Sequence, residues 1–290
     1  MFHDFLVIIE AYPLFGYVFL FAIAATVGSF LNVVIYRYPI MIEYDYAEII
    51  RDNSNSLSSN VSEILEKGKG LSFSFPSSHC FSCSKKIKWY HNIPIFSYLL
   101  LGGKCFNCKE KYSIRYFYIE LIHTLGWLSL FYCYGATIEF IVFSIVFTLI
   151  LTMSMIDFDH KILPDGLVFS LYGLGLIYST TSSSLISPED AIINSIFGFL
   201  VCHSFISLYS KIRGKLMMGF GDIKLIAATL TFIPLISVVM GVLTASGLGI
   251  LYYASLKLLN KLDEDKSIPF GPFICFGFFI QLLMFNQNLF

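Results

Sequence analysis

The sequence predicts an all-α polytopic membrane protein with about eight transmembrane helices. Hydrophobic residues make up 56% of the 290 residues, only 13% are charged, and the mean hydropathy is +0.73. One soluble core cannot bury this much apolar surface, so a membrane protein is indicated. Runs of about 17–25 apolar residues can cross the hydrocarbon layer. Six such runs lie at 14–36, 116–134, 137–156, 166–184, 190–209 and 268–286.

A seventh run, 222–256, is too long for one helix. Its 35 residues fit two short spans with a turn between Pro234 and Gly241, which makes eight spans in all. Cytoplasmic loops are rich in Lys and Arg. With eight spans and the N-terminus outside, all 19 basic residues fall on the cytoplasmic side, whereas a single span at 222–256 would place the lysines that follow it outside. The charge distribution therefore favours two spans.

This topology divides the chain into three parts. Residues 1–37 form the first transmembrane segment, 38–115 form a cytoplasmic loop between the first and second spans, and 116–290 form a seven-helix membrane domain. Within the loop, the stretch 40–75 is polar and rich in Ser and Asn, which predicts a mobile insertion. We expect the lipid bilayer to be the chain's main environment and nucleic acid not to be a partner.

Four cysteines in the loop form two CxxC pairs, Cys80 with Cys83 and Cys105 with Cys108, and 21 residues separate the pairs. Two such pairs can present four thiolates tetrahedrally to one zinc ion. Two disulfides are the alternative, but the loop is assigned to the reducing side of the membrane, where disulfides are disfavoured. Because four protein ligands leave no open position for substrate, we expect a structural zinc site.

Two acids lie at the cytoplasmic ends of apolar runs, Asp157 and Asp222, and the topology places them at a similar depth. Two carboxyls a few ångströms apart cannot both ionise easily, so one keeps a proton while the other can activate water. This pairing is the chemistry of an aspartic protease. Gly219 and Gly221, in the stretch GFGDIK, would let an extended substrate approach Asp222 closely.

Other readings of these residues remain open at this point. Each acid alone could be an interfacial helix cap, and Lys224 could simply extend its ammonium group to the interface. An ion-coupled transporter could use the acids to bind protons or cations, but it predicts inverted repeats that the sequence lacks. A scaffold of a secretion apparatus would use the cysteine loop and leave the acids unexplained.

Motifs spread over most of the chain resemble those of the type IV prepilin peptidases, which are bifunctional membrane aspartic proteases of bacteria. The resemblance is carried by the first-span motif GSFLNVVIYR, the cysteine loop with WYHNIP, the segment from Asp157 to Asp165, the GFGDIKL block and the PFGP motif at 269–272. Phe117 stands where the family usually has proline. Any one motif alone would be weak, whereas their common order is specific.

The resemblance implies that Asp157 and Asp222 are the catalytic pair, with Gly219, Gly221 and Lys224 as supporting residues. Asp159 and Asp165 compete for the first catalytic position. Asp157 is preferred because it matches the leading acid of the family and closes the apolar run. In this reading 116–290 is the membrane aspartic protease domain, and the loop cysteines are the zinc ligands.

The resemblance also implies the reaction and its location. A protein of this kind cleaves the leader of type IV prepilins or type II secretion pseudopilins at the cytoplasmic face of the bacterial inner membrane. It then N-methylates the new N-terminal residue from S-adenosylmethionine. The sequence shows no glycine-rich strand-to-helix turn of the usual nucleotide-binding kind, so no residue is assigned to this cofactor.

Overall fold

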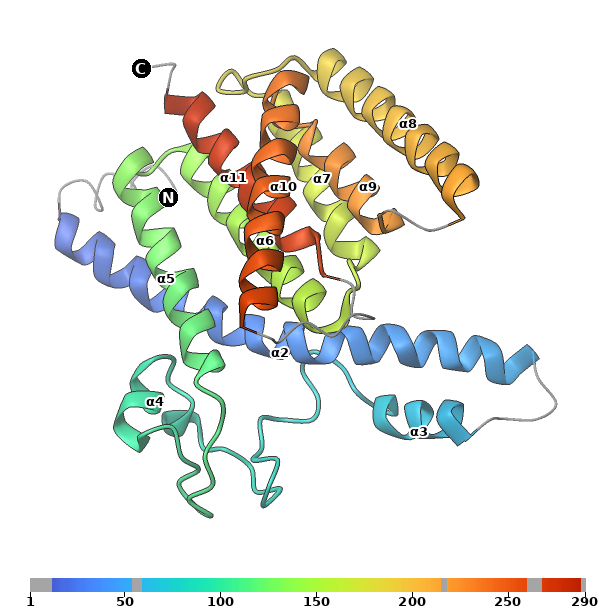
Figure 1. Ribbon diagram of the computed structural model, residues 1–290. Helices are drawn as coiled ribbons and strands as arrows, with labels where there is room; N and C mark the ends of the chain where they lie inside the picture. The colour runs from blue at the N-terminus through green and yellow to red at the C-terminus, as the bar shows by residue number, and fades with distance from the viewer. Residues whose placement is uncertain (1–11, 54–58, 215–217, 260–267, 288–290) are drawn as a thin grey trace. The chain divides into compact units, whose positions relative to one another are not determined.

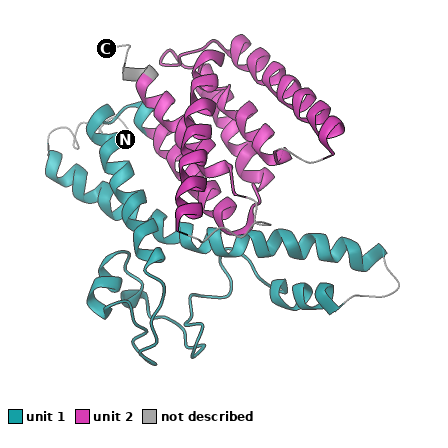
Figure 2. Cartoon of the chain, viewed as in Figure 1, with its two compact units in different colours: residues 1–140 teal, residues 141–290 magenta. Residues whose placement is uncertain are grey.

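The computed structural model describes residues 12–53, 59–214, 218–259 and 268–287, and Figure 1 shows that these form helices and connecting loops. Only two isolated β-bridges and no β-strand occur within these ranges, which confirms the all-α prediction. The chain forms two compact units, Met1–Phe140 and Ile141–Phe290, which Figure 2 shows in two colours.

Unit 1 is built on two long apolar helices, α2 and α5, that pack against each other. The helix α2 does not end with the apolar run at Tyr36 but continues to Asn53, and α3 packs against it. Most of the described part of the stretch 40–75, which the sequence predicts to be a mobile insertion, is therefore helical. The helices of unit 1 are α2 (Pro13–Asn53), α3 (Ser59–Gly68), the 3₁₀ helix η1 (Trp89–His91), α4 (Phe96–Leu101) and α5 (Arg115–Tyr134).

The two long helices of unit 1 run antiparallel, and polar contacts fix their register. The side-chain amide of Asn32 donates to the carbonyl oxygen of Tyr116 at 3.2 Å. Towards the start of α2 and the end of α5, Nδ1 of His123 lies 2.9 Å from the carbonyl oxygen of Ala24. Both side chains are buried, so these hydrogen bonds satisfy groups that would be costly to leave unpaired between apolar helices.

Arg37 ends the apolar part of α2 and holds the chain that follows α3. Its guanidinium donates to the carbonyl oxygens of Ser72 at 2.7 Å and Pro76 at 2.6 Å. The residue is only 8% exposed, so these bonds replace water around the charge. The contact fixes the start of the segment that leads to the cysteine pairs.

Unit 2 is a helical bundle with the short helix α9 at its core. Seven of the ten residues of α9 are buried, and the helix packs against α7, α8 and α11. Leu225 and Ala228 are completely inaccessible to solvent. The helices of the bundle are α6 (Ile138–His160), α7 (Asp165–Ser179), α8 (Pro188–Arg213), α9 (Phe220–Thr229), α10 (Leu235–Leu258) and α11 (Gly271–Gln287).

Four of the described helices, α2, α6, α8 and α10, are long and apolar enough to cross a membrane, and α11 is a shorter apolar helix. The run 222–256 does contain two helices. The turn lies at 230–234, before the expected stretch from Pro234 to Gly241, because Pro234 is the N-cap of α10. Proline suits a helix start, where its missing N–H has no intrahelical partner to lose. At about 1.5 Å per residue, α9 extends only about 15 Å.

Candidate active site and metal centre

The two predicted catalytic acids lie at the ends of two helices of unit 2. Asp157 is in the last turn of α6, and Asp222 is in the first turn of α9, three residues after its N-cap Gly219. Both carboxyls are buried, with exposed fractions of 6% for Asp157 and 9% for Asp222. Buried carboxylic acids are uncommon unless they have partners, so their surroundings identify what each can do.

Asp157 is held by the backbone at the start of α11. The N–H of Gly271 donates to Oδ2 of Asp157 at 3.0 Å. A Cβ atom at residue 271 would lie 2.7 Å from that oxygen and 3.1 Å from Cγ, so only glycine lets the backbone come this close. The sequence had indicated Gly271 only as part of the PFGP motif, without a role. The structure makes it the hydrogen-bond donor to the first acid.

Leu163 connects the surroundings of the two acids. A Cβ atom at Gly221, next to Asp222, would lie 3.0 Å from Cβ of Leu163, and one at Gly271 would lie 3.3 Å from its Cδ2. The same side chain therefore packs against both backbone segments that carry or hold the acids. The carboxyls of Asp157 and Asp222 are also near enough to interact electrostatically. The structure thus brings together two acids that are 65 positions apart in the chain.

The other residues of the GFGD stretch differ in how closely they are packed. At Gly219, an added Cβ would meet Oδ2 of Asp222 at 3.4 Å, which is an ordinary contact. At Gly221 the contact with Leu163 is tighter, at 3.0 Å. Of the two glycines, Gly221 is the one at which an added Cβ would press against a neighbouring side chain.

Lys224 forms an ion pair rather than simply reaching for the interface. Its Nζ lies 2.7 Å from Oδ1 and 2.9 Å from Oδ2 of Asp165, and 4.8 Å from the ring centroid of Phe220. The pair joins α9 to the first turn of α7. Asp165, an alternative first acid, is therefore engaged and has a 57% exposed side chain. Asp159 is exposed as well, so Asp157 is the buried acid of the three.

The four loop cysteines come together in unit 1. Their sulfur atoms all lie within 4.8 Å of one another, and Sγ of Cys80 is 3.7 Å from Sγ of Cys108. Four thiolates at about 2.3 Å around a tetrahedral zinc ion are about 3.8 Å apart, so this donor set fits zinc. A disulfide would need a sulfur separation of about 2.05 Å. The described residues place both CxxC pairs in one cluster, as the zinc hypothesis requires.

The surroundings of Cys80 and Cys108 shift the pKa values of their thiols in different directions. The N–H groups of Cys83 and Ser82 face the sulfur of Cys80 and lower its pKa to about 6. The backbone N–H of Glu110 favours the thiolate of Cys108, but desolvation and the neighbouring sulfurs raise the pKa of Cys108 to about 11. Four thiols this close cannot all ionise without a cation among them.

A side-chain hydrogen bond also links the two CxxC pairs. Nζ of Lys85, next to the first pair, donates to Oδ1 of Asn107 in the second pair at 3.0 Å.

Comparison with known proteins gives a consistent result over most of the chain. Residues 22–134 match the model of the bacterial peptidase A24 N-terminal domain, and residues 144–254 match the type IV leader peptidase family. The first match includes the four loop cysteines, and the second includes both acids. Gly271 lies beyond the second match.

Curated relatives cover nearly the whole chain. A prepilin leader peptidase/N-methyltransferase of Legionella pneumophila is 32% identical over 276 residues, which are 93% of this chain and 92% of the relative. Proteins with the same name from Stutzerimonas stutzeri and Pseudomonas aeruginosa are each 34% identical, over 90% of this chain and 88% of the relative. No solved structure matches the chain.

Proposed function

Since the chain belongs to the type IV leader peptidase family, we propose that it removes the leader of type IV prepilins or type II secretion pseudopilins by means of Asp157 and Asp222. As a member of this family it is a protease that is also an N-methyltransferase. The observation that carries the assignment of the acids is their burial at the ends of α6 and α9, near enough to interact electrostatically. The transporter alternative has no support among the relatives.

In the proposed mechanism one acid acts as a general base and the other as a general acid. One carboxylate takes a proton from a water molecule, which attacks the scissile carbonyl, while the other carboxyl donates a hydrogen bond to that carbonyl and then a proton to the leaving amine. Gly271 fixes one oxygen of Asp157 and so sets the plane of its carboxyl. The ion pair of Lys224 with Asp165 holds the first turn of α9, and thereby Asp222, in place.

The predicted topology suits such a substrate. A prepilin has a basic leader in the cytoplasm followed by an apolar helix in the bilayer, so its scissile bond lies near the cytoplasmic interface. The distribution of Lys and Arg favours a position at that interface for the end of α6 and the start of α9. We assign the chain eight membrane segments in the bacterial inner membrane, with the acids accessible from the cytoplasm.

The cysteine cluster has a structural role in this proposal. Cys80, Cys83, Cys105 and Cys108 would hold one zinc ion, which would replace a hydrophobic core in a segment that has few buried side chains. S-adenosylmethionine supplies the methyl group for the second reaction, and no residue of this chain is assigned to it.

Cleavage of a synthetic prepilin by the purified, detergent-solubilised chain tests the proposal. We expect release of the leader by the wild-type chain and none by Asp157→Asn or Asp222→Asn. Asp159→Asn is the matched control, because it removes the same charge two residues from Asp157 at an exposed position, and it should retain cleavage. If either buried variant cleaved at the wild-type rate while folded, that acid would not be catalytic.

A further inference from the structure

An apolar segment inside the predicted cytoplasmic loop has several strongly exposed side chains. The segment 93–101 has the sequence IPIFSYLLL and includes α4. Leu100 is 85% exposed, Leu99 is 61% exposed and Phe96 is 51% exposed. Neighbouring aliphatic side chains that are this accessible normally mark a surface that another apolar phase covers.

The position of the segment along α2 indicates what that phase is. The N–H of Ile95 donates to Oε2 of Glu120 on α5 at 2.7 Å. A Cβ atom at Gly28 would lie only 3.1 Å from Cα of Glu120, so these residues are at the same level of the helix pair. Gly28 lies nine residues before Arg37 in α2. At about 1.5 Å per residue, Gly28 is therefore about 13 Å from Arg37, in the direction of the N-terminal, apolar end of the helix. The segment therefore starts beside the membrane-spanning part of the helix.

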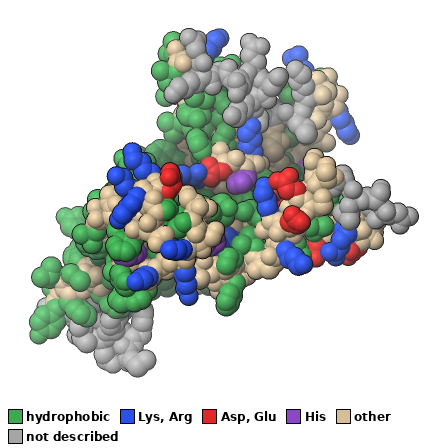
Figure 3. Space-filling model, turned by 90° about the horizontal axis from the view of Figure 1, so that it is seen from below, with side chains coloured by type: hydrophobic (Ala, Val, Ile, Leu, Met, Phe, Trp, Pro, Cys, Tyr) green, Lys and Arg blue, Asp and Glu red, His purple; other side chains and the backbone are tan. Residues whose placement is uncertain are grey.

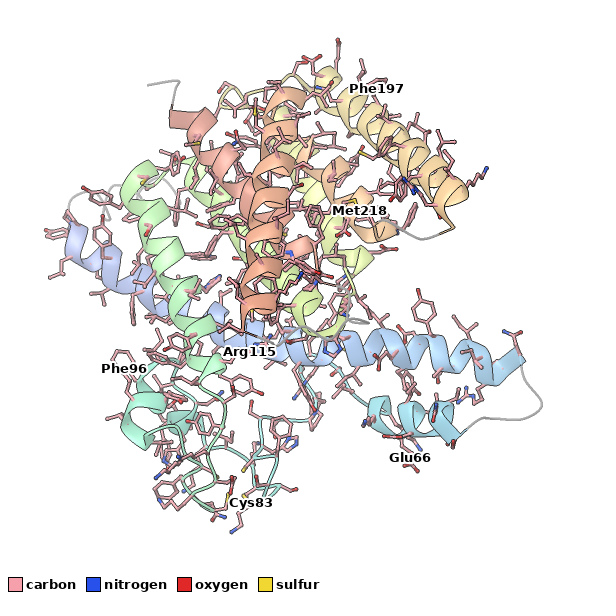
Figure 4. All side chains as sticks on the ribbon, viewed as in Figure 1. Glu66, Cys83, Phe96, Arg115, Phe197 and Met218 are labelled. Carbon is pink, nitrogen blue, oxygen red and sulfur yellow. The ribbon has the colours of Figure 1, made fainter. Side chains whose placement is uncertain are left out.

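An aromatic contact extends this position further along the span. The rings of Phe96 and Phe21 meet edge to face, with 6.0 Å between their centroids, and Figure 4 shows Phe96 on α4. Phe21 is in the first half of the apolar run 14–36. The side chain of Phe96 thus contacts the apolar run of α2, and the exposed part of this run must face lipid if it spans the membrane.

Most backbone N–H groups of the segment have partners within the protein. Within lipid, each backbone N–H must have a partner in the protein. Pro94 has no N–H, the N–H of Ile95 bonds to Glu120, and the N–H of Phe96 donates to the carbonyl oxygen of Pro94 at 2.6 Å. The amides of Ser97, Leu99, Gly102 and Gly103 donate to oxygens within the segment 93–101. The chain turns at Ile95, which has a positive φ of 64°. The carboxylate of Glu120 accepts the hydrogen bond from the N–H at this turn.

Residues suited to a membrane interface flank the segment. Trp89 is 80% exposed, and tryptophan favours the level of the lipid headgroups. From 77 to 115 the chain has one acidic residue, Glu110, so we expect the basic side chains of this stretch to meet anionic headgroups. Figure 3 shows Lys and Arg side chains in blue on the face of the molecule seen from below. The basic residues of this stretch are Lys85, Lys86, Lys88, Lys104, Lys109, Lys111 and Arg115.

We propose that segment 93–101 is not part of a water-exposed loop but inserts into the cytoplasmic leaflet, with Leu99 and Leu100 in the hydrocarbon and the flanking lysines at anionic headgroups. The lipid ligand is an anionic bilayer. The loop 38–115 then enters the membrane between its cysteine pairs. The cysteine cluster is thereby held against the membrane surface.

Tryptophan fluorescence can test this insertion, because the chain contains only two tryptophans, Trp89 and Trp127. In a Trp89→Phe/Trp127→Phe background, Leu100→Trp places one reporter at the tip of α4. Phe106→Trp is the matched control, because Phe106 is also exposed, at 56%, but lies between the cysteines of the second pair. Each full-length variant is reconstituted in nanodiscs of phosphatidylglycerol and phosphatidylcholine with brominated acyl chains.

We expect bromine to quench the reporter at 100 several-fold more than the reporter at 106, with a blue-shifted emission at 100. Equal or weaker quenching at 100 would overturn the proposal. A blue shift at 100 without quenching would also overturn it, since a second copy of the chain or another protein would then cover the segment. Removing phosphatidylglycerol should reduce quenching at 100, and an unchanged value would refute the role of the lysines. The readout does not depend on peptidase activity.

Discussion

The backbone N–H of Gly271 and the carboxyl of Asp157 meet across 114 positions of the chain, at a donor–acceptor distance of 3.0 Å. This hydrogen bond joins the end of α6 to the start of α11, and it requires the absence of a side chain at residue 271. One of the two proposed catalytic acids is thus oriented by a residue whose only contribution is its backbone.

Gly271→Ala should therefore impair leader cleavage. The new Cβ would push Asp157 away, because it would otherwise lie 2.7 Å from Oδ2. A displacement of about 1 Å can cost about 100-fold in rate. We therefore expect kcat/KM for a prepilin peptide to fall by about that factor. Gly247→Ala in α10 is the control, since no atom lies within 4 Å of its added Cβ. Equal activity of the two variants would contradict the role of Gly271.

The two glycines before Asp222 should differ in their response to substitution. Gly221→Ala adds a Cβ at 3.0 Å from Leu163, whereas Gly219→Ala adds one in ordinary contact, at 3.4 Å from Asp222. Without substrate, we expect Gly221→Ala to lower the midpoint of thermal unfolding more than Gly219→Ala does. The measurement is a thermal melt in detergent. A larger destabilisation by Gly219→Ala would show that the packing around Leu163 is not the limiting contact.

The ion pair between Lys224 and Asp165 predicts a charge-dependent effect on catalysis. Lys224→Met and Asp165→Asn should each lower kcat for leader cleavage, because α9 is then less firmly held against α7. Stability should change little, since a partly exposed pair contributes about 0.2–1 kcal/mol. The exchanged pair, Lys224→Asp with Asp165→Lys, should recover part of kcat. If the exchange were worse than both single variants together, the pair would not act through this attraction.

Metal analysis should find one zinc ion per chain in freshly purified protein. Cys108→Ser should reduce the zinc content and lower the thermal stability of unit 1, because the four sulfur atoms are ligands within one cluster. Cys133→Ser removes an exposed cysteine on α5 outside the cluster and should leave both quantities unchanged. A zinc-free wild-type chain with disulfides between the two CxxC pairs would reverse the assignment.

Much of the local structure followed from short-range patterns in the sequence. Apolar runs of membrane-spanning length became the long helices α6, α8 and α10, because helices are the regular way to satisfy the backbone in an apolar environment. The CxxC spacing likewise led to the cysteine cluster, since each pair closes a knuckle by local hydrogen bonds such as that from Lys109 to Cys105. These features need information from only a few neighbouring residues.

Other features could not be read from such patterns. The sequence placed the turn of 222–256 too late. It left Lys224 open between a supporting residue and an interfacial cation, and it gave Gly271 no partner. It also gave Ile95 no partner, whereas the N–H of Ile95 donates to Glu120 on α5. For Lys224, Gly271 and Ile95, the decisive partner belongs to a different helix.

By itself, the sequence determined a helical membrane chain, a four-cysteine cluster and two acids at the ends of apolar runs. Only the tertiary structure decided that Asp157 is the buried acid of its segment, that Gly271 orients it and that Lys224 pairs with Asp165. The physical reason is the distance along the chain over which each kind of interaction acts. Hydropathy and ligand spacing act between neighbours in the chain, whereas burial and hydrogen bonding between helices depend on how the helices pack.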